Sequence, residues 1–233
     1  MHRISIPDTV LDAIRRQRGK LFRFERLVGP RTALVVIDLQ NCFMLPGMPV
    51  EVPTAREIVP NVNRLAAAVR AAGGMVVWMK MTLEGQQESW SVFFAGDRRR
   101  ATLEQLTPGA LGHELYAGLD VRPDDLVVPK TRYSAFIQGS SDLDRRLRDR
   151  GVDTVIIAGT LTNVCCESSA RDAMMLNYRV VFVSDANAAL SDAEHNATLA
   201  TVFRTFGDVE TTDQVIERLV TADRELPAAG ATV

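Results

Sequence analysis

The feature that most constrains the fold of this chain is a series of five short apolar runs, separated by segments with helical periodicity. The runs cover residues 32–38, 75–81, 125–128, 154–158 and 179–184. The fourth run, Thr-Val-Ile-Ile-Ala, is typical of a strand buried on both faces, because it is rich in β-branched residues and carries no charge. Alternation of such runs with helices predicts an α/β fold: a doubly wound, mostly parallel sheet between two layers of helices.

Four segments between or after these runs are predicted to be helices. Residues 58–72 carry an apolar stripe at helical spacing, and Gly73 ends the segment. Further helices are expected over 142–150, 165–178 and 192–206. A Ser-x-x-Glu pattern precedes the last of these, and it is typical of a capping box that satisfies the first free amides of a helix.

The domain organisation follows from length and composition. A chain of 233 residues with 46% hydrophobic content is long enough for one domain with a substantial core. We expect an N-terminal arm with a short helix over 1–30, a single α/β domain over 31–225 and a loose tail over 226–233. The sequence leaves open whether the arm packs on its own domain or on a neighbouring subunit. The long stretch 82–111 is placed to cover a site at the strand ends.

Charge and cysteine content exclude several classes of protein. The 27 basic and 29 acidic residues give a formal net charge of −2, which predicts no nucleic-acid or membrane partner. Three cysteines, two of them adjacent, cannot form a disulfide framework, and the N-terminus lacks the layout of a signal peptide. No apolar run approaches the roughly 20 residues needed to cross a bilayer. We therefore expect a cytoplasmic protein.

A cysteine pair, Cys165 and Cys166, lies where the fourth apolar run gives way to a predicted helix. The free amides and the dipole at a helix N-terminus stabilise a thiolate, the reactive form of cysteine. The same amides are suited to receive the oxyanion of a tetrahedral intermediate. Taken alone, however, a cysteine pair is more often buried packing than a reactive group.

Two other strand ends carry residues that favour the reactive interpretation. Asp38 follows the first apolar run, and Lys130 follows the third. Because ligands bind at the carboxyl ends of parallel strands, we expect both side chains to lie near Cys165. A carboxylate can take the thiol proton, while an ammonium keeps that carboxylate ionised. The sequence therefore predicts a nucleophilic site built from a carboxylate, a lysine ammonium and a thiol.

These residues resemble the isochorismatase-like cysteine hydrolases, and the resemblance extends from residue 32 to about residue 219. Three blocks carry it in order: Val-Ile-Asp-Leu-Gln-Asn at 36–41, Pro-Lys-Thr-Arg-Tyr-Ser-Ala-Phe at 129–136, and Gly-Thr-Leu-Thr-Asn-Val-Cys at 159–165. The blocks look closest to the amidohydrolase branch of ureidoacrylate and N-carbamoylsarcosine amidohydrolases. The resemblance implies a hydrolase domain over 31–225 that cleaves a small amide or ureide C–N bond through a thioester, with no cofactor.

The resemblance also implies a role for each residue. Asp38 becomes the general base, Lys130 its electrostatic partner and Cys165 the nucleophile. A cis peptide is implied between Thr160 and Leu161. The backbone N–H groups of Leu161 and Cys165 would then form an oxyanion hole.

Cys166 is assigned to helix packing rather than to catalysis. The family pattern places the nucleophile directly after Thr-Asn-Val, which selects Cys165. Cys166 lies about 100° further around the helix and shares a face with Ala170 and Ala173. We expect that face to point into the core.

Candidate residues for substrate binding are Asn41, Phe43, Trp90, Tyr133 and Val164. For the aromatic members, ordinary core packing is an equally good interpretation. The expected partner is a small amide or ureide, and we expect a homo-oligomer, either a dimer or a tetramer.

A metal site is not expected. Nicotinamidases of this superfamily bind a metal through an Asp-x-His pattern and a second histidine. This chain has only His2, His113 and His195, and none has ligand spacing.

Three other functions compete with amide hydrolysis. A vinyl-ether hydrolase of the isochorismatase type shares the fold but lacks the cysteine nucleophile, so Cys165 counts against it. A redox role is disfavoured because adjacent cysteines seldom form a relaxed disulfide. A catalytically silent binding protein with the same fold stays open.

Overall fold

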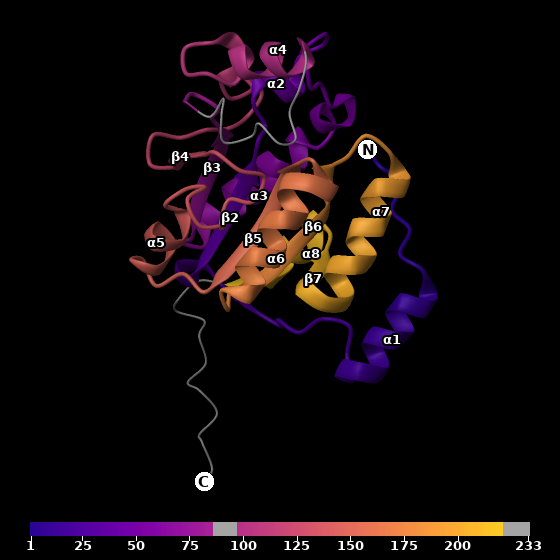
Figure 1. Cartoon of the computed structure of the whole chain (residues 1–233). Helices are drawn as coiled ribbons and strands as arrows, with labels where there is room; N and C mark the ends of the chain where they lie inside the picture. Colours follow the sequence, from indigo (N-terminus) through magenta and orange to yellow (C-terminus); the bar gives the residue numbers. More distant parts are fainter. Residues whose placement is uncertain (86–96, 221–233) are drawn as a thin grey trace.

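The computed structural model describes residues 1–85 and 97–220, and its centre is a six-stranded sheet (Figure 1). Every neighbouring pair in this sheet is parallel, and the strand order is β4-β3-β2-β5-β6-β7. A separate two-stranded parallel sheet joins β1 and β8. The strands are β1 Leu27–Val28, β2 Thr32–Ile37, β3 Met75–Met81, β4 Leu126–Lys130, β5 Thr154–Thr160, β6 Arg179–Ala188, β7 Asp208–Glu210 and β8 Leu219–Val220.

Helices cover both faces of the central sheet. In Figure 1, α6 and α7 lie in front of the sheet, and α3 and α8 pack together behind it. All residues of β2 and β5 are buried, as expected for central strands between two helical layers. The helices are α1 Asp8–Arg18, α2 Asn41–Met44, α3 Val59–Ala71, α4 Asp97–Gln105, α5 Leu143–Arg148, α6 Glu167–Met175, α7 Asp192–Thr201 and α8 Thr212–Arg218.

The predicted fold class is confirmed, and all five apolar runs are neighbouring strands of the central sheet. The sequence did not reveal β7, which has only three residues, two of them acidic. Its side chains are nevertheless buried, because Asp208 and Glu210 are paired with arginines. Short strands of this kind carry no apolar pattern that a sequence could display.

The predicted helix over 165–178 differs in its first turn. Helix α6 begins only at Glu167, and a π-helical turn, Thr162–Cys166, leads into it. The N–H of Cys166 donates to the carbonyl of Leu161, five residues earlier, at 3.1 Å. Cys165 therefore lies in a widened turn and not at a regular helix N-terminus. Such π-turns occur frequently at functional sites.

The N-terminal arm packs on its own chain. The Arg18 guanidinium donates to the carbonyl of Phe203 at 2.7 Å and pairs with Asp208 at 3.2 Å. The Asp208 carboxylate also accepts from the backbone N–H groups of Arg23 and Phe24. The predicted tail, 226–233, lies outside the described residues. None of the helices within the described ranges is long and apolar enough to span a membrane.

Gly159, near the end of β5, offers a test of how closely the two central strands approach. Its φ is +124°, and a Cβ built there would lie 2.1 Å from the carbonyl oxygen of Ile37 in β2. We expect Gly159→Ala to lower the free energy of unfolding by about 3 kcal/mol or more, because overpacking adds to backbone strain. Urea unfolding followed by circular dichroism measures this change.

Gly47→Ala is the matched control. Gly47 also has a positive φ, +80°, but a Cβ there meets nothing within 4 Å. Backbone strain alone predicts a loss of about 1–2 kcal/mol. Equal losses in the two variants would show that the contact with Ile37 is not the limiting constraint.

Candidate active site

The carboxyl ends of β2 and β4 bring Asp38 and Lys130 together. The Lys130 ammonium lies 2.8 Å from Oδ2 of Asp38, and both side chains are fully buried. The two strands are not neighbours, because β3 lies between them. The ion pair therefore reaches across the end of β3, and the predicted contact between this acid and this lysine is confirmed.

Asp38 occupies an unusual backbone conformation. Its φ is +54°, in the left-handed region that few residues other than glycine adopt. Aspartate tolerates this region better than most residues. The Asp38 N–H still donates to the carbonyl of Met79, at 3.1 Å, so the main chain leaves the sheet only after this residue.

Burial and opposite charge compete at this ion pair. Burial raises the pKa of the Asp38 carboxyl, and the nearby Lys130 offsets only part of that rise. Burial disfavours the Lys130 ammonium, yet the charge of Asp38 and the hydrogen bond to it act against burial, and the pKa of Lys130 is raised. Lys130 also donates to the carbonyl of Arg132 at 3.0 Å. The lysine is therefore held as a cation.

Cys165 is buried beside this ion pair, and here one expectation is wrong. The helix N-terminus was expected to favour the thiolate. Instead, burial raises the pKa of the Cys165 thiol above its ordinary value, and the negative charge of Asp38 adds to the rise against the opposing effect of Lys130. The resting group is consequently a neutral thiol, which needs a base before it can attack.

Cys166 lies where the sequence placed it. Like Ala170 and Ala173, it is fully buried. Burial also raises the pKa of the Cys166 thiol. Cys165, unlike Cys166, lines a cavity.

Ser169 ties the cysteine turn to the loop that follows β4. Its hydroxyl donates to the carbonyl of Cys165 at 2.7 Å and accepts from the backbone N–H of Ala135 at 3.0 Å. Because Ser169 is four residues, about one helical turn, beyond Cys165, the sequence predicts that the two lie close together. Its bond to the distant loop has no signal in the sequence.

His195 holds the beginning of the same turn. Its Nε2 lies 2.9 Å from the carbonyl of Ser184, so Nε2 donates, and Nδ1 accepts from the Thr162 hydroxyl at 2.9 Å. Burial lowers the pKa of His195 to about 4, which keeps the ring neutral and able to accept. The ring of His2, from the N-terminal arm, stacks on it at 4.4 Å. Sequence reasoning missed this arrangement, because its members are far apart in the chain.

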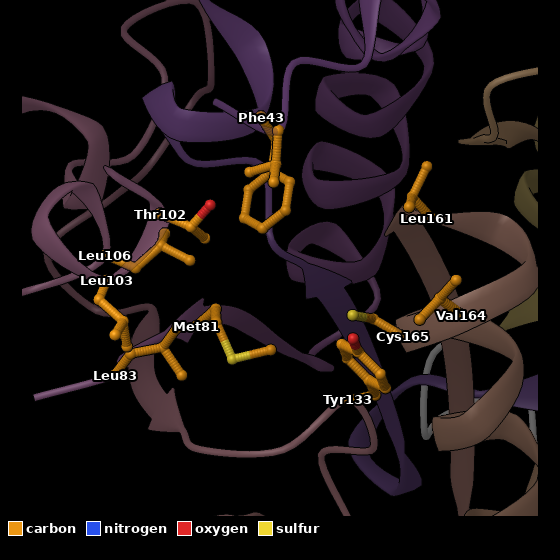
Figure 2. A pocket seen from close by; sticks show the side chains of 11 residues that line it. Phe43, Met81, Leu83, Thr102, Leu103, Leu106, Tyr133, Leu161, Val164 and Cys165 are labelled. Carbon is orange, nitrogen blue, oxygen red and sulfur yellow. The ribbon is translucent and has the colours of Figure 1, made fainter. Parts of the chain in front are cut away.

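A cavity of about 170 Å³ opens directly onto the Cys165 thiol. Figure 2 shows the Cys165 and Tyr133 side chains on one side of it and Leu83, Leu103 and Leu106 across from them. Its walls come from several separate segments of the chain. The lining residues are Phe43, Val50, Met81, Leu83, Thr102, Leu103, Leu106, Tyr133, Leu161, Val164 and Cys165.

Three of the five residues named for substrate binding, Phe43, Tyr133 and Val164, line this cavity. Asn41 is not among the residues that line it, and its side-chain amide donates to the carbonyl of Leu111 at 3.0 Å. Trp90 lies outside the described residues. Contact with substrate stays a prediction for the three that line the cavity.

The backbone beside Cys165 has the expected form. The peptide bond between Thr160 and Leu161 is cis, as predicted. Within the described part of the chain, the N–H of Leu161 makes no hydrogen bond. In the same part of the chain, no group of three or more His, Cys, Asp or Glu residues is arranged to hold a metal ion.

Comparison with known proteins gives a consistent result. The isochorismatase domain model matches residues 32–214. The ureidoacrylate amidohydrolase RutB of Variovorax paradoxus is 34% identical over 209 residues, which cover 82% of this chain and 82% of that protein.

Solved structures extend the likeness to the fold. A cysteine hydrolase from Pseudomonas syringae superposes with a TM-score of 0.77 at 33% identity, covering 86% of this chain and 97% of that one. An N-carbamoylsarcosine amidase from Thermoplasma acidophilum gives a TM-score of 0.65 at 26% identity, covering 78% and 97%. With the domain match, these likenesses show that the chain belongs to the isochorismatase family of hydrolases.

Proposed function

We propose that this protein hydrolyses the C–N bond of a small amide or ureide through a thioester on Cys165. The observation that carries the proposal is the buried Asp38–Lys130 ion pair next to a buried thiol that opens onto a cavity. The relatives named as an amidohydrolase and an amidase support the same bond type. Assembly into a homo-oligomer stays a prediction.

The first step is proton transfer from the Cys165 thiol to Asp38. Because the thiol pKa is raised, little thiolate exists before substrate binds. The pKa of the Asp38 carboxyl is raised too, which makes it a stronger base than an exposed aspartate. Lys130 keeps it ionised until the proton arrives.

The second step is attack on the substrate carbonyl. We place the resulting oxyanion at the N–H groups of Leu161 and Cys165, because both residues line the cavity. Asp38 then returns its proton to the leaving nitrogen, so that ammonia or an amine departs. Water attacks the thioester next and regenerates the thiol.

A screen for ammonia release over small carboxamides and ureides tests the proposed reaction. We expect turnover of at least one class, with an acyl-enzyme adduct on the Cys165 peptide in quenched samples analysed by mass spectrometry. If no compound is turned over and no adduct forms, the binding-protein alternative is favoured.

Substitution of the two cysteines separates nucleophile from packing. Cys165→Ala is expected to lower kcat/KM by at least about 10³-fold, because it removes the attacking atom. Cys166→Ala removes only a buried sulfur, so we expect kcat/KM within about threefold of wild type and a lower melting temperature. An inactive Cys166→Ala protein that is still folded would contradict this assignment.

The pH dependence of activity tests the base. Asp38 acts when deprotonated, so kcat/KM must fall as the pH drops through its pKa. Because burial raises that pKa, the acid limb should have its midpoint above the ordinary carboxyl value of about 3.9. Circular dichroism at each pH controls for unfolding. A folded enzyme with full activity at pH 4 would contradict the role of Asp38.

A further inference from the structure

The cavity beside Cys165 has almost wholly apolar walls. Among the described residues that line it, the polar side-chain groups are the hydroxyls of Thr102 and Tyr133 and the Cys165 thiol. Burial raises the pKa of the Tyr133 hydroxyl, which therefore stays neutral. No lysine, arginine, histidine or carboxylate belongs to this described lining.

The ion pair behind the cavity is not available to a ligand. Met81 lines the cavity, and its sulfur lies 4.0 Å from the Lys130 ammonium, so the ion pair lies just behind this wall. Lys130 is fully buried and is paired with Asp38 at 2.8 Å. A carboxylate on the substrate would therefore lose its water without gaining a cation from the described lining residues.

The size of the cavity sets a second limit. An apolar cavity of about 150 Å³ in another protein stays dry and binds benzene. At about 170 Å³, the cavity next to Cys165 has room for a group of similar size. Leu83, Leu103 and Leu106 would contact the far end of such a group, as their positions in Figure 2 indicate.

We propose that the acyl group accepted by this site is uncharged and apolar, a branched aliphatic or aromatic group of roughly benzene size. This inference rests on the proposed amide hydrolysis and narrows its substrate. The reaction is RCONH2 + H2O giving RCOO⁻ and NH4⁺, with RCO–S–Cys165 as the intermediate. The product carboxylate is charged, so the same apolar walls that bind the amide favour release of the product.

A pair of isosteric amides tests this specificity directly. In 4-methylpentanamide, an isopropyl group stands where succinamate has a carboxylate. We expect kcat/KM to be at least about 100-fold higher for 4-methylpentanamide. Along acetamide, propanamide and butanamide, kcat/KM should rise about fourfold per methylene, the equivalent of about 0.8 kcal/mol. Equal or better hydrolysis of succinamate would overturn the inference but leave amide hydrolysis itself intact.

A cation added to the cavity wall should weaken the preference for the uncharged amide. Leu103 is partly exposed in α4 and lines the cavity, so Leu103→Arg places a guanidinium at its wall. We expect this variant to lower the ratio of kcat/KM for 4-methylpentanamide to kcat/KM for succinamate by at least tenfold. Leu111→Arg is the matched control, because Leu111 is 61% exposed and does not line the cavity. The control should keep the wild-type ratio of kcat/KM values. A similar change in both variants would contradict the assignment of Leu103 to the cavity wall.

Binding to Cys165→Ala separates this inference from the proposed reaction. We expect isothermal titration calorimetry to detect 4-methylpentanamide and benzamide and to show binding at least tenfold weaker for succinamate. This preference is measurable even if neither amide is turned over by the wild-type enzyme. If succinamate binds as tightly as 4-methylpentanamide, or if neither neutral amide binds, the inference fails.

Discussion

The buried ion pair between Asp38 and Lys130 is the constraint on which the site depends. Each charge alone would cost several kcal/mol to bury, so neither is stable in the core without the other. The pair can form only if β2 and β4 end at the same level on either side of β3. The register of three strands is thus linked to one electrostatic contact, and loss of a single partner is expected to cost about 3–5 kcal/mol.

The ion pair also separates the site into two environments. Behind Met81 lies the buried Asp38–Lys130 ion pair, and the Cys165 thiol beside that pair lines the cavity. In front of Met81, the apolar cavity binds the acyl group mainly through shape complementarity and dispersion contacts. The cysteine turn is held between the two, by Ser169 on one side and by the neutral His195 on the other. The stabilisation of charge and the fit of the substrate's acyl group therefore depend largely on different residues.

This division explains how much the sequence could predict. The strands were predictable because their apolar, β-branched residues are buried on both faces. Asp38, Lys130 and Cys165 were predictable because parallel strands bring their carboxyl ends to one edge. The stretch 82–111 was expected to cover the site, and Thr102, Leu103 and Leu106 from it do line the cavity. Which of its residues form the wall had no signal, because these leucines look the same as core leucines until the tertiary structure is known. The raised thiol pKa was missed for a related reason: a helix terminus suggests a stabilised thiolate, whereas burial is a property of the whole fold.

A raised thiol pKa fits an apolar cavity better than a lowered one would. A resting thiolate at this wall would be a desolvated anion next to leucines and would attract water into the cavity. A neutral thiol leaves the cavity wall uncharged until an apolar amide enters. Proton transfer to Asp38 then leaves the charge on the thiolate and, after attack, on the substrate oxygen, where the Leu161 amide has no other partner in the described chain. The raised pKa that makes the free thiol unreactive therefore also restricts its reaction to a bound substrate.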